Sequence, residues 1–124
     1  MNATKKRSFW VARLMLMLLL FPMISHAHVH MNKSQPDKGE VLTAAPAVVQ
    51  LWFSGGVSAE WSKVEVTDAK GERVDSGAVS NISGDANSLQ INLKPIGSGN
   101  YVIKWNAVAG DGHRIKGSSP FSVK

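Results

Sequence analysis

The sequence predicts an all-β fold, an immunoglobulin-like Greek-key antiparallel β-sandwich or barrel of about seven strands. Three observations support this prediction. Apolar and polar residues alternate with a period of two through most of the chain beyond residue 30, which is the pattern of half-buried strands. Clusters of turn-forming residues separate these runs. No stretch offers a persuasive amphipathic helix.

The N-terminal residues are typical of a secretory signal peptide. Residues 5–7 are cationic, residues 14–24 form an apolar run, and residues 25–27 read Ser-His-Ala, with small residues where signal peptidase reads them. We therefore expect a cleavable signal peptide, residues 1–27, and one domain, residues 28–124, which begins at His28. An uncleaved anchor is less favoured, because the apolar run would span about 16 Å as a helix against a hydrocarbon core of about 30 Å.

Cleavage would also remove most of the basic character of the chain. It takes away four of the 14 Lys and Arg residues and none of the nine Asp and Glu residues. The remaining basic residues are dispersed singly, so nucleic-acid binding is not supported. The chain has no cysteine. The domain therefore has no disulfide, and no thiolate for metal binding or nucleophilic chemistry.

The predicted strands follow in order along the domain, with weaker candidates at residues 31–34 and 74–79. Turn formers lie between them at residues 36–39, 68–71, 83–85, 95–99 and 110–112. The apolar faces of the stronger strands consist of Val49, Leu51 and Phe53; Val64 and Val66; Leu89, Ile91 and Leu93; Tyr101, Ile103, Trp105 and Ala107; and Phe121 and Val123.

Two tryptophans need separate interpretations. Trp105 shares the alternating face of Tyr101 and Ile103, so we expect it in the core, as sandwiches commonly bury one such ring. Trp61 follows a Gly-Gly pair and could be partly exposed. Isolated surface aromatics are normal, so Trp61 is not interpreted as a ligand-stacking residue.

Cleavage before His28 would place a free α-amino group and an imidazole on one residue. Both nitrogens can chelate the same ion, and Cu(II) prefers square-planar nitrogen and oxygen ligands. The turn that follows the Tyr101 strand reads Asp111-Gly112-His113. Residues two apart in extended chain project to the same side, so Asp111 and His113 could present an oxygen and a nitrogen to one point. Alone, this tripeptide is more simply read as a turn with an exposed histidine.

These residues together resemble the CopC-type periplasmic copper-resistance proteins. The similarity covers the whole predicted domain. It includes the Ala-His junction at His28, Pro36-x-x-Gly39, Ala45-Pro46, Val49-x-Leu51-x-Phe53-Ser54, Gly99-x-Tyr101-x-Ile103-x-Trp105, Asp111-Gly112-His113, Gly117 and Phe121-Ser122-Val123. The resemblance implies a Greek-key β-barrel or sandwich and one Cu(II) ion held by His28, Asp111 and His113. It also implies a periplasmic location and, as partner, an inner-membrane copper transporter of the CopD type or another periplasmic copper carrier.

The chain departs from that family in two places. Many relatives carry a methionine-rich loop for Cu(I), whereas here only Met31 lies beyond the signal peptide. We therefore expect Cu(II) binding without a second, Cu(I) site. Relatives often have an acidic residue after the Phe-Ser of the early strand, where Gly55 stands here. The contact that this acidic residue would make near the metal site is therefore either missing here or supplied by another group.

His30 leaves an alternative open. After cleavage, the α-amine, two deprotonated backbone amides and the imidazole of His30 could form a local square-planar site that needs no fold. We favour the folded site of His28, Asp111 and His113, because its ligands need no amide deprotonation and can be oriented by the fold. His30 is then an auxiliary ligand or lies on the opposite face of the strand.

The function predicted from the sequence is copper sequestration, tolerance or delivery by a non-enzymatic protein with no membrane anchor after cleavage. A small oxidative copper enzyme with an N-terminal histidine chelate is one alternative. A carboxylate in the copper plane would leave it little open coordination, and a catalytic metal needs an open position. A metal-free β-sandwich interaction module is the other alternative.

Overall fold

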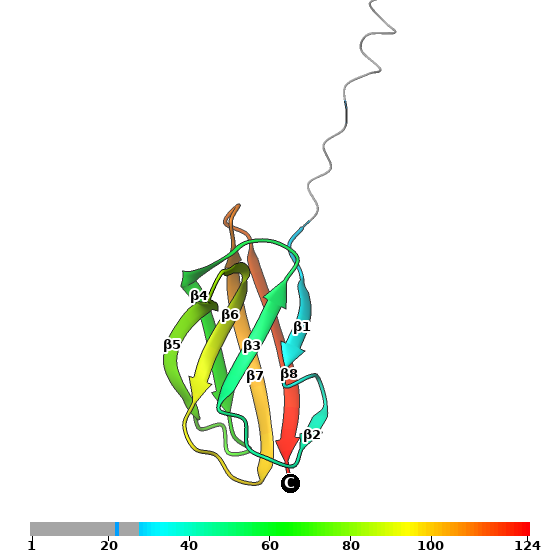
Figure 1. Ribbon diagram of the computed structural model, residues 1–124, viewed down its shortest axis with the longest axis vertical. Coiled ribbons are helices and arrows are strands. Elements are labelled where there is room, and N and C mark those ends of the chain that lie inside the picture. The colour runs from blue at the N-terminus through cyan, green and yellow to red at the C-terminus, as the bar shows by residue number, and fades with distance from the viewer. Residues whose placement is uncertain (1–21, 23–27) are drawn as a thin grey trace, which may run out of the picture.

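The alternating apolar residues become the inner faces of two packed β-sheets (Figure 1). The computed structural model describes residue 22 and residues 28–124. The expected signal peptide therefore lies outside the described residues except for Pro22, and its cleavage stays a prediction. The strands in the described part are β1 (Met31–Gln35), β2 (Glu40–Leu42), β3 (Val48–Phe53), β4 (Val57–Thr67), β5 (Asp75–Ile82), β6 (Asp85–Leu93), β7 (Gly99–Ala109) and β8 (Arg114–Val123).

The two sheets each contain four strands, in the orders β1-β3-β6-β5 and β2-β8-β7-β4. Every pairing in the first sheet is antiparallel, as are β4 with β7 and β7 with β8 in the second. The predicted all-β sandwich is thus confirmed, with one strand more than expected. Among the described residues there is no helix long and apolar enough to span a membrane.

The core lies between the sheets and contains most of the residues that the alternation predicted; Leu93 is only partly buried, whereas Val57 and Ala109 are additional members. Val49, Leu51, Leu89 and Ile103 are completely or almost completely buried. Trp105 is also buried, as expected, and its indole lies directly over Gly117, where a Cβ atom would be 2.3 Å from the ring carbon Cζ2. The glycine is therefore required by packing. Trp61 is 67% exposed, which agrees with its expected surface position.

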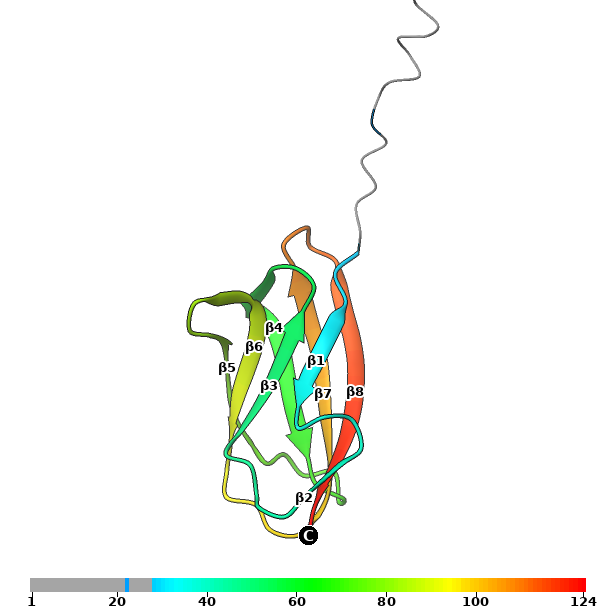
Figure 2. The same cartoon turned by 45° about the vertical axis from the view of Figure 1, so that its right-hand side comes forward.

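The additional strand, β2, joins the second sheet by parallel pairing with the distant strand β8. Its three residues are too few to show an alternating pattern. The backbone fixes it instead: the amide of Gly39 donates to the carbonyl of Pro120, and the amide of Lys124 donates to the carbonyl of Leu42. β2 lies at the end of the sandwich that carries the C-terminus (Figure 2).

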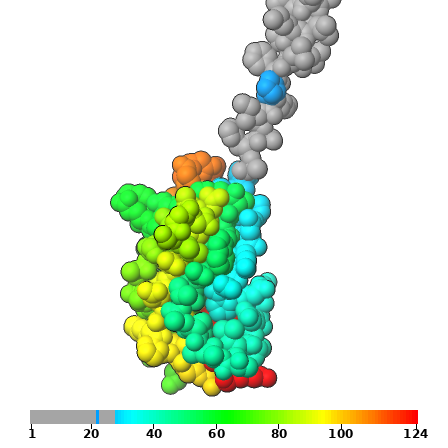
Figure 3. All heavy atoms as spheres, viewed as in Figure 1, coloured from blue at the N-terminus to red at the C-terminus, as the bar shows by residue number. Residues whose placement is uncertain are grey.

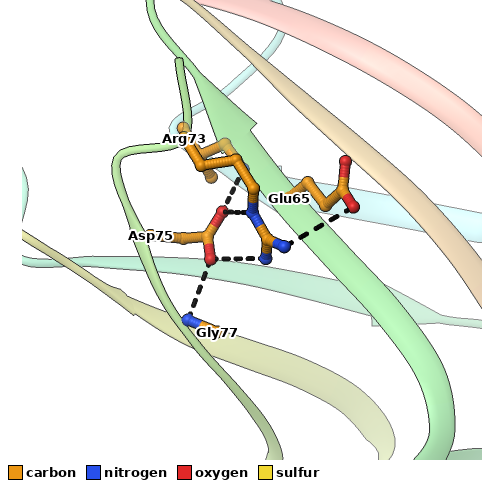
Figure 4. Close-up of polar contacts among 5 residues, drawn as sticks. Glu65, Arg73, Asp75 and Gly77 are labelled. Carbon is orange, nitrogen blue, oxygen red and sulfur yellow. Dashed lines mark hydrogen bonds and ion pairs between the residues drawn. The ribbon is translucent and has the colours of Figure 1, made fainter.

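A buried carboxylate ties the edge strands β4 and β5 together (Figure 4). Asp75 is 4% exposed and accepts hydrogen bonds from Arg73 at 2.7 and 3.1 Å and from the backbone amides of Val66 and Gly77, each at 2.8 Å. Burial raises the pKa of Asp75, but the bonds from Arg73 and from the two amides outweigh it and lower that pKa below its ordinary value.

Candidate metal centre

Residues 28–30, where the continuous described segment begins, lead into β1 at one end of the sandwich. His30 is held there by a reciprocal pair of hydrogen bonds with Ser54, just after β3. The amide of Ser54 donates to the carbonyl of His30 at 2.8 Å, and the amide of His30 donates to Ser54 Oγ at 3.0 Å. His28, two residues before this attachment, is exposed. The pairing of β1 with β3 thus decides where His28 lies.

The loop between β7 and β8 lies at the same end of the molecule, opposite the C-terminus (Figures 1 and 2). The β7–β8 hairpin closes with the amide of Ala109 donating to the carbonyl of His113, and Gly112 adopts a φ of 88°. A left-handed conformation of this kind suits glycine. The amide of Gly110 also donates to the carbonyl of Gly56 at 3.1 Å, which ties the loop to the turn after β3.

The two segments bring His28 and His113 together. Their ring centroids are 5.5 Å apart, with an interplanar angle of 69°. Figure 3 shows the surface of the β7–β8 loop and the start of the domain exposed at the same end of the molecule. The N-terminal segment therefore reaches the Asp-Gly-His loop, as a joint site of His28, Asp111 and His113 requires.

Asp111 is bound to His113 in two ways. The amide of His113 donates to Asp111 Oδ1 at 3.1 Å, and Nδ1 of the His113 ring lies 2.7 Å from Asp111 Oδ2. These contacts hold the pKa of Asp111 below its ordinary value, and the backbone hydrogen bond from His113 has the largest effect. The carboxylate is therefore ionised at neutral pH, beside an imidazole. When a carboxylate holds one ring nitrogen, the other is free to face a metal ion.

The described residues contain no ready-made group of three or more His, Asp or Glu side chains in metal-binding geometry. His28 and His113 approach each other, and Asp111 contacts His113, but the three do not yet converge. Within the full chain, the nitrogen of His28 is a peptide nitrogen bonded to Ala27. The donor set of two imidazoles and a carboxylate suits Cu(II), and an α-amine would become available only after cleavage.

His30 lies beside the pair without facing it as closely. Its Nδ1 is 3.5 Å from the carbonyl oxygen of His28, at the limit of a hydrogen bond, and the side chain is exposed. Its backbone amide, which the local copper site would need as a deprotonated ligand, donates to Ser54 Oγ. The contact between Ser54 and the N-terminal segment was not predicted from the sequence. The available signal was that Ser54 directly follows a predicted strand and therefore lies at its end.

Comparison with known proteins identifies a family and several relatives of this chain. Residues 31–124 match the family model for the CopC domain. The chain is 33% identical over 119 residues to the copper transport protein CutJ of Bacillus subtilis, covering 95% of this chain and 22% of that protein. It is 34% identical over 102 residues to protein YobA of Escherichia coli K12, covering 79% and 80% of the two chains. It is 32% identical over 112 residues to copper resistance protein C of Pseudomonas syringae, covering 86% and 88%.

Two solved structures share the fold. CopC from Methylosinus trichosporium OB3b superposes with a TM-score of 0.73 at 26% identity, covering 78% of this chain and 94% of that one. PcoC of Escherichia coli, described as a methionine-rich copper resistance protein, superposes with a TM-score of 0.66 at 30% identity, covering 79% and 100%. Methionine enrichment is absent beyond residue 27 of the present sequence, where Met31 stands alone.

Proposed function

This chain belongs to the CopC family, and from that premise we propose that it is a periplasmic Cu(II)-binding protein that sequesters copper or delivers it. The family relatives named for copper resistance and copper transport support a copper-related function. We further propose that the recipient of the copper is an inner-membrane transporter of the CopD type or another periplasmic carrier. A catalytic role is not part of it.

The observation that carries the proposal is the approach of His28 to His113. These residues stand at opposite ends of the domain sequence, and their rings lie 5.5 Å apart only because β1 and the β7–β8 hairpin share one end of the sandwich. Two exposed imidazoles beside an ionised carboxylate are a suitable set for a divalent copper ion. If the Asp111-Gly112-His113 turn had only a structural role, it would not need His28 beside it.

In the proposed site, processed His28 binds through its α-amine and imidazole, His113 through an imidazole nitrogen and Asp111 through a carboxylate oxygen. The bound Cu(II) would be a cargo ion held by nitrogen and oxygen ligands. The side chains of His113 and Asp111 are 68% and 57% exposed. A partner protein can therefore reach the ligands directly, which suits acquisition and release of the ion.

The hydrogen bond from the His30 amide to Ser54 Oγ favours this folded site over the local alternative. Copper binding through the amide nitrogen of His30 would require that amide to lose its proton and its partner. The other bond to Ser54, which the Ser54 amide donates to the carbonyl of His30, does not involve that nitrogen. The folded site leaves both bonds intact.

The test uses processed protein that begins at His28. Cu(II) affinity is measured by competition with a chelator, and the ligand set by electron paramagnetic resonance. His113→Ala should weaken binding by more than the roughly 10–100-fold that loss of an outer-sphere partner costs. His30→Ala is the matched control, because it also removes one exposed imidazole, and it should bind as the parent does. The reverse ranking would overturn the folded site, and no tight Cu(II) binding by the parent would overturn the function.

A further inference from the structure

The turn after β3 contains adjacent glycines, Gly55 and Gly56, that meet different surroundings. Neither has the positive φ that requires glycine. A Cβ atom on Gly56 would have nothing within 4 Å. A Cβ atom on Gly55 would lie 2.8 Å from Cγ2 of Val29, and the other atoms nearest to it also belong to Val29. Only Gly55 is therefore needed for a close approach, and what approaches is the N-terminal segment.

Val29 has little freedom to move away. Its side chain is half-buried and packs against the hydrophobic core, and a β-branched side chain is restricted in its χ1 rotation. On its C-terminal side, His30 is fixed to Ser54 by the two reciprocal hydrogen bonds. The segment is thus seated at two adjacent points, with Val29 over Gly55 and His30 on Ser54.

We propose that Gly55 is a positioning residue for the copper site, acting through Val29 to direct His28 toward His113. This inference rests on the proposed Cu(II) site. Any side chain at position 55 would push Val29 outward by about 1 Å to reach ordinary carbon–carbon contact distance. His28 directly precedes Val29 in the chain. The displacement of Val29 therefore passes directly to His28, a proposed copper ligand. Binding sites need their groups held to within about 0.5 Å, and the shift exceeds that tolerance.

The experiment compares Gly55→Ala with Gly56→Ala in processed protein beginning at His28. Gly55→Ala should lower Cu(II) affinity by about 10–100-fold, the range for loss of an orienting contact, and should change the electron paramagnetic resonance spectrum. Gly56→Ala should do neither, because its new methyl group meets open space. Equal affinities and spectra in the two variants, with tight binding by the parent, would overturn the positioning role while leaving the proposed function standing.

A rescue variant separates positioning from a general loss of stability. Val29→Ala removes the methyl group that a Cβ at position 55 would meet, so Val29→Ala/Gly55→Ala should recover most of the affinity lost in Gly55→Ala. A general destabilisation would instead add the effects of the two changes. Additive losses of affinity would therefore refute the contact as the cause.

A metal-free readout keeps the inference testable even if the parent binds no copper. Hydrogen exchange of the Ser54 amide, which donates to the carbonyl of His30, should accelerate in Gly55→Ala but not in Gly56→Ala. Unchanged protection of that amide in Gly55→Ala would show that the segment is not displaced and would overturn the inference without reference to copper.

Discussion

Replacing Asp75 by alanine should destabilise the fold strongly, although this residue lies in an irregular edge strand. The carboxylate accepts bonds from the amide of Val66, a fully buried residue, and from Gly77 and Arg73 (Figure 4). An orphaned buried amide costs about 1–3 kcal/mol, and a lost net hydrogen bond about 0.5–1.5 kcal/mol. Arg73 is 48% exposed, so its charge returns to solvent at little cost. The expected loss is about 2–4 kcal/mol.

The assay is urea unfolding, with Glu65→Ala as the matched control. Glu65 also faces Arg73, at 3.7 Å, but its side chain is 44% exposed. Loss of such an exposed ion pair costs about 0–1 kcal/mol. Both variants remove one carboxylate beside the same arginine, so the difference isolates the buried bonds. A loss in Asp75→Ala no larger than that in Glu65→Ala would refute the reasoning.

The pH dependence gives a second check on Asp75. Its pKa in the folded protein is lowered, so its stabilising contribution is present above the unfolded value of about 3.9 and disappears as the pH falls through the lower folded value. The difference in unfolding free energy between the parent and Asp75→Asn should therefore be constant from neutral pH to about pH 5 and shrink below about pH 4. A difference that stays constant in acid would contradict this.

Three further outcomes follow from the structure and composition. Gly117→Ala should lower the unfolding free energy by about 1–3 kcal/mol because its methyl group would overlap the Trp105 ring; Gly97→Ala, with nothing within 4 Å, is the control, and equal urea midpoints would disprove the overlap. Ser119→Ala should raise that free energy by about 1 kcal/mol, since Ser119 Oγ is buried without a partner in the described structure; a loss of stability would contradict it. Competition with a Cu(I) chelator should reveal no tight Cu(I) site in residues 28–124, where Met31 is the one soft ligand; a stable stoichiometric complex would show the opposite.

Much of the fold was predictable from the sequence because strands with one buried face carry the period of two. β3 and β7 are the clearest cases: Val49, Leu51, Ile103 and Trp105 are all buried as the alternation predicted. β2 could not be predicted in this way. Its three residues are held by backbone bonds to β8, which is almost the whole domain away in sequence.

The Asp75 network was missed for a related reason. Two of its donors are the backbone amides of Val66 and Gly77. Every residue except proline has such an amide, so these donors give no signal in the sequence. The spacing of Arg73 and Asp75 is the one available signal, since residues two apart in extended chain project to the same side. That signal alone does not show that Asp75 is buried between two edge strands.

The candidate site was predictable in its residue types but not in its geometry. The chemistry of His28, Asp111 and His113 is visible in the sequence, whereas their proximity depends on which end of the sandwich receives β1. The seating of the N-terminal segment on Ser54 and Gly55 was also invisible, because a glycine at position 55 gives no indication of the side chain that approaches it. Metal binding by the three residues stays a prediction.

The measurement that tests the central claim most directly is the Cu(II) affinity of two versions of the chain, one beginning at His28 and one retaining Ala27. The two differ by one small residue, which converts the α-amine of His28 into a peptide nitrogen and leaves every imidazole and carboxylate in place. Tight one-to-one binding by the first version and a loss of at least about 100-fold in the second, beyond any outer-sphere effect, are the expected results. Equal affinities would contradict a site built on the processed N-terminal histidine.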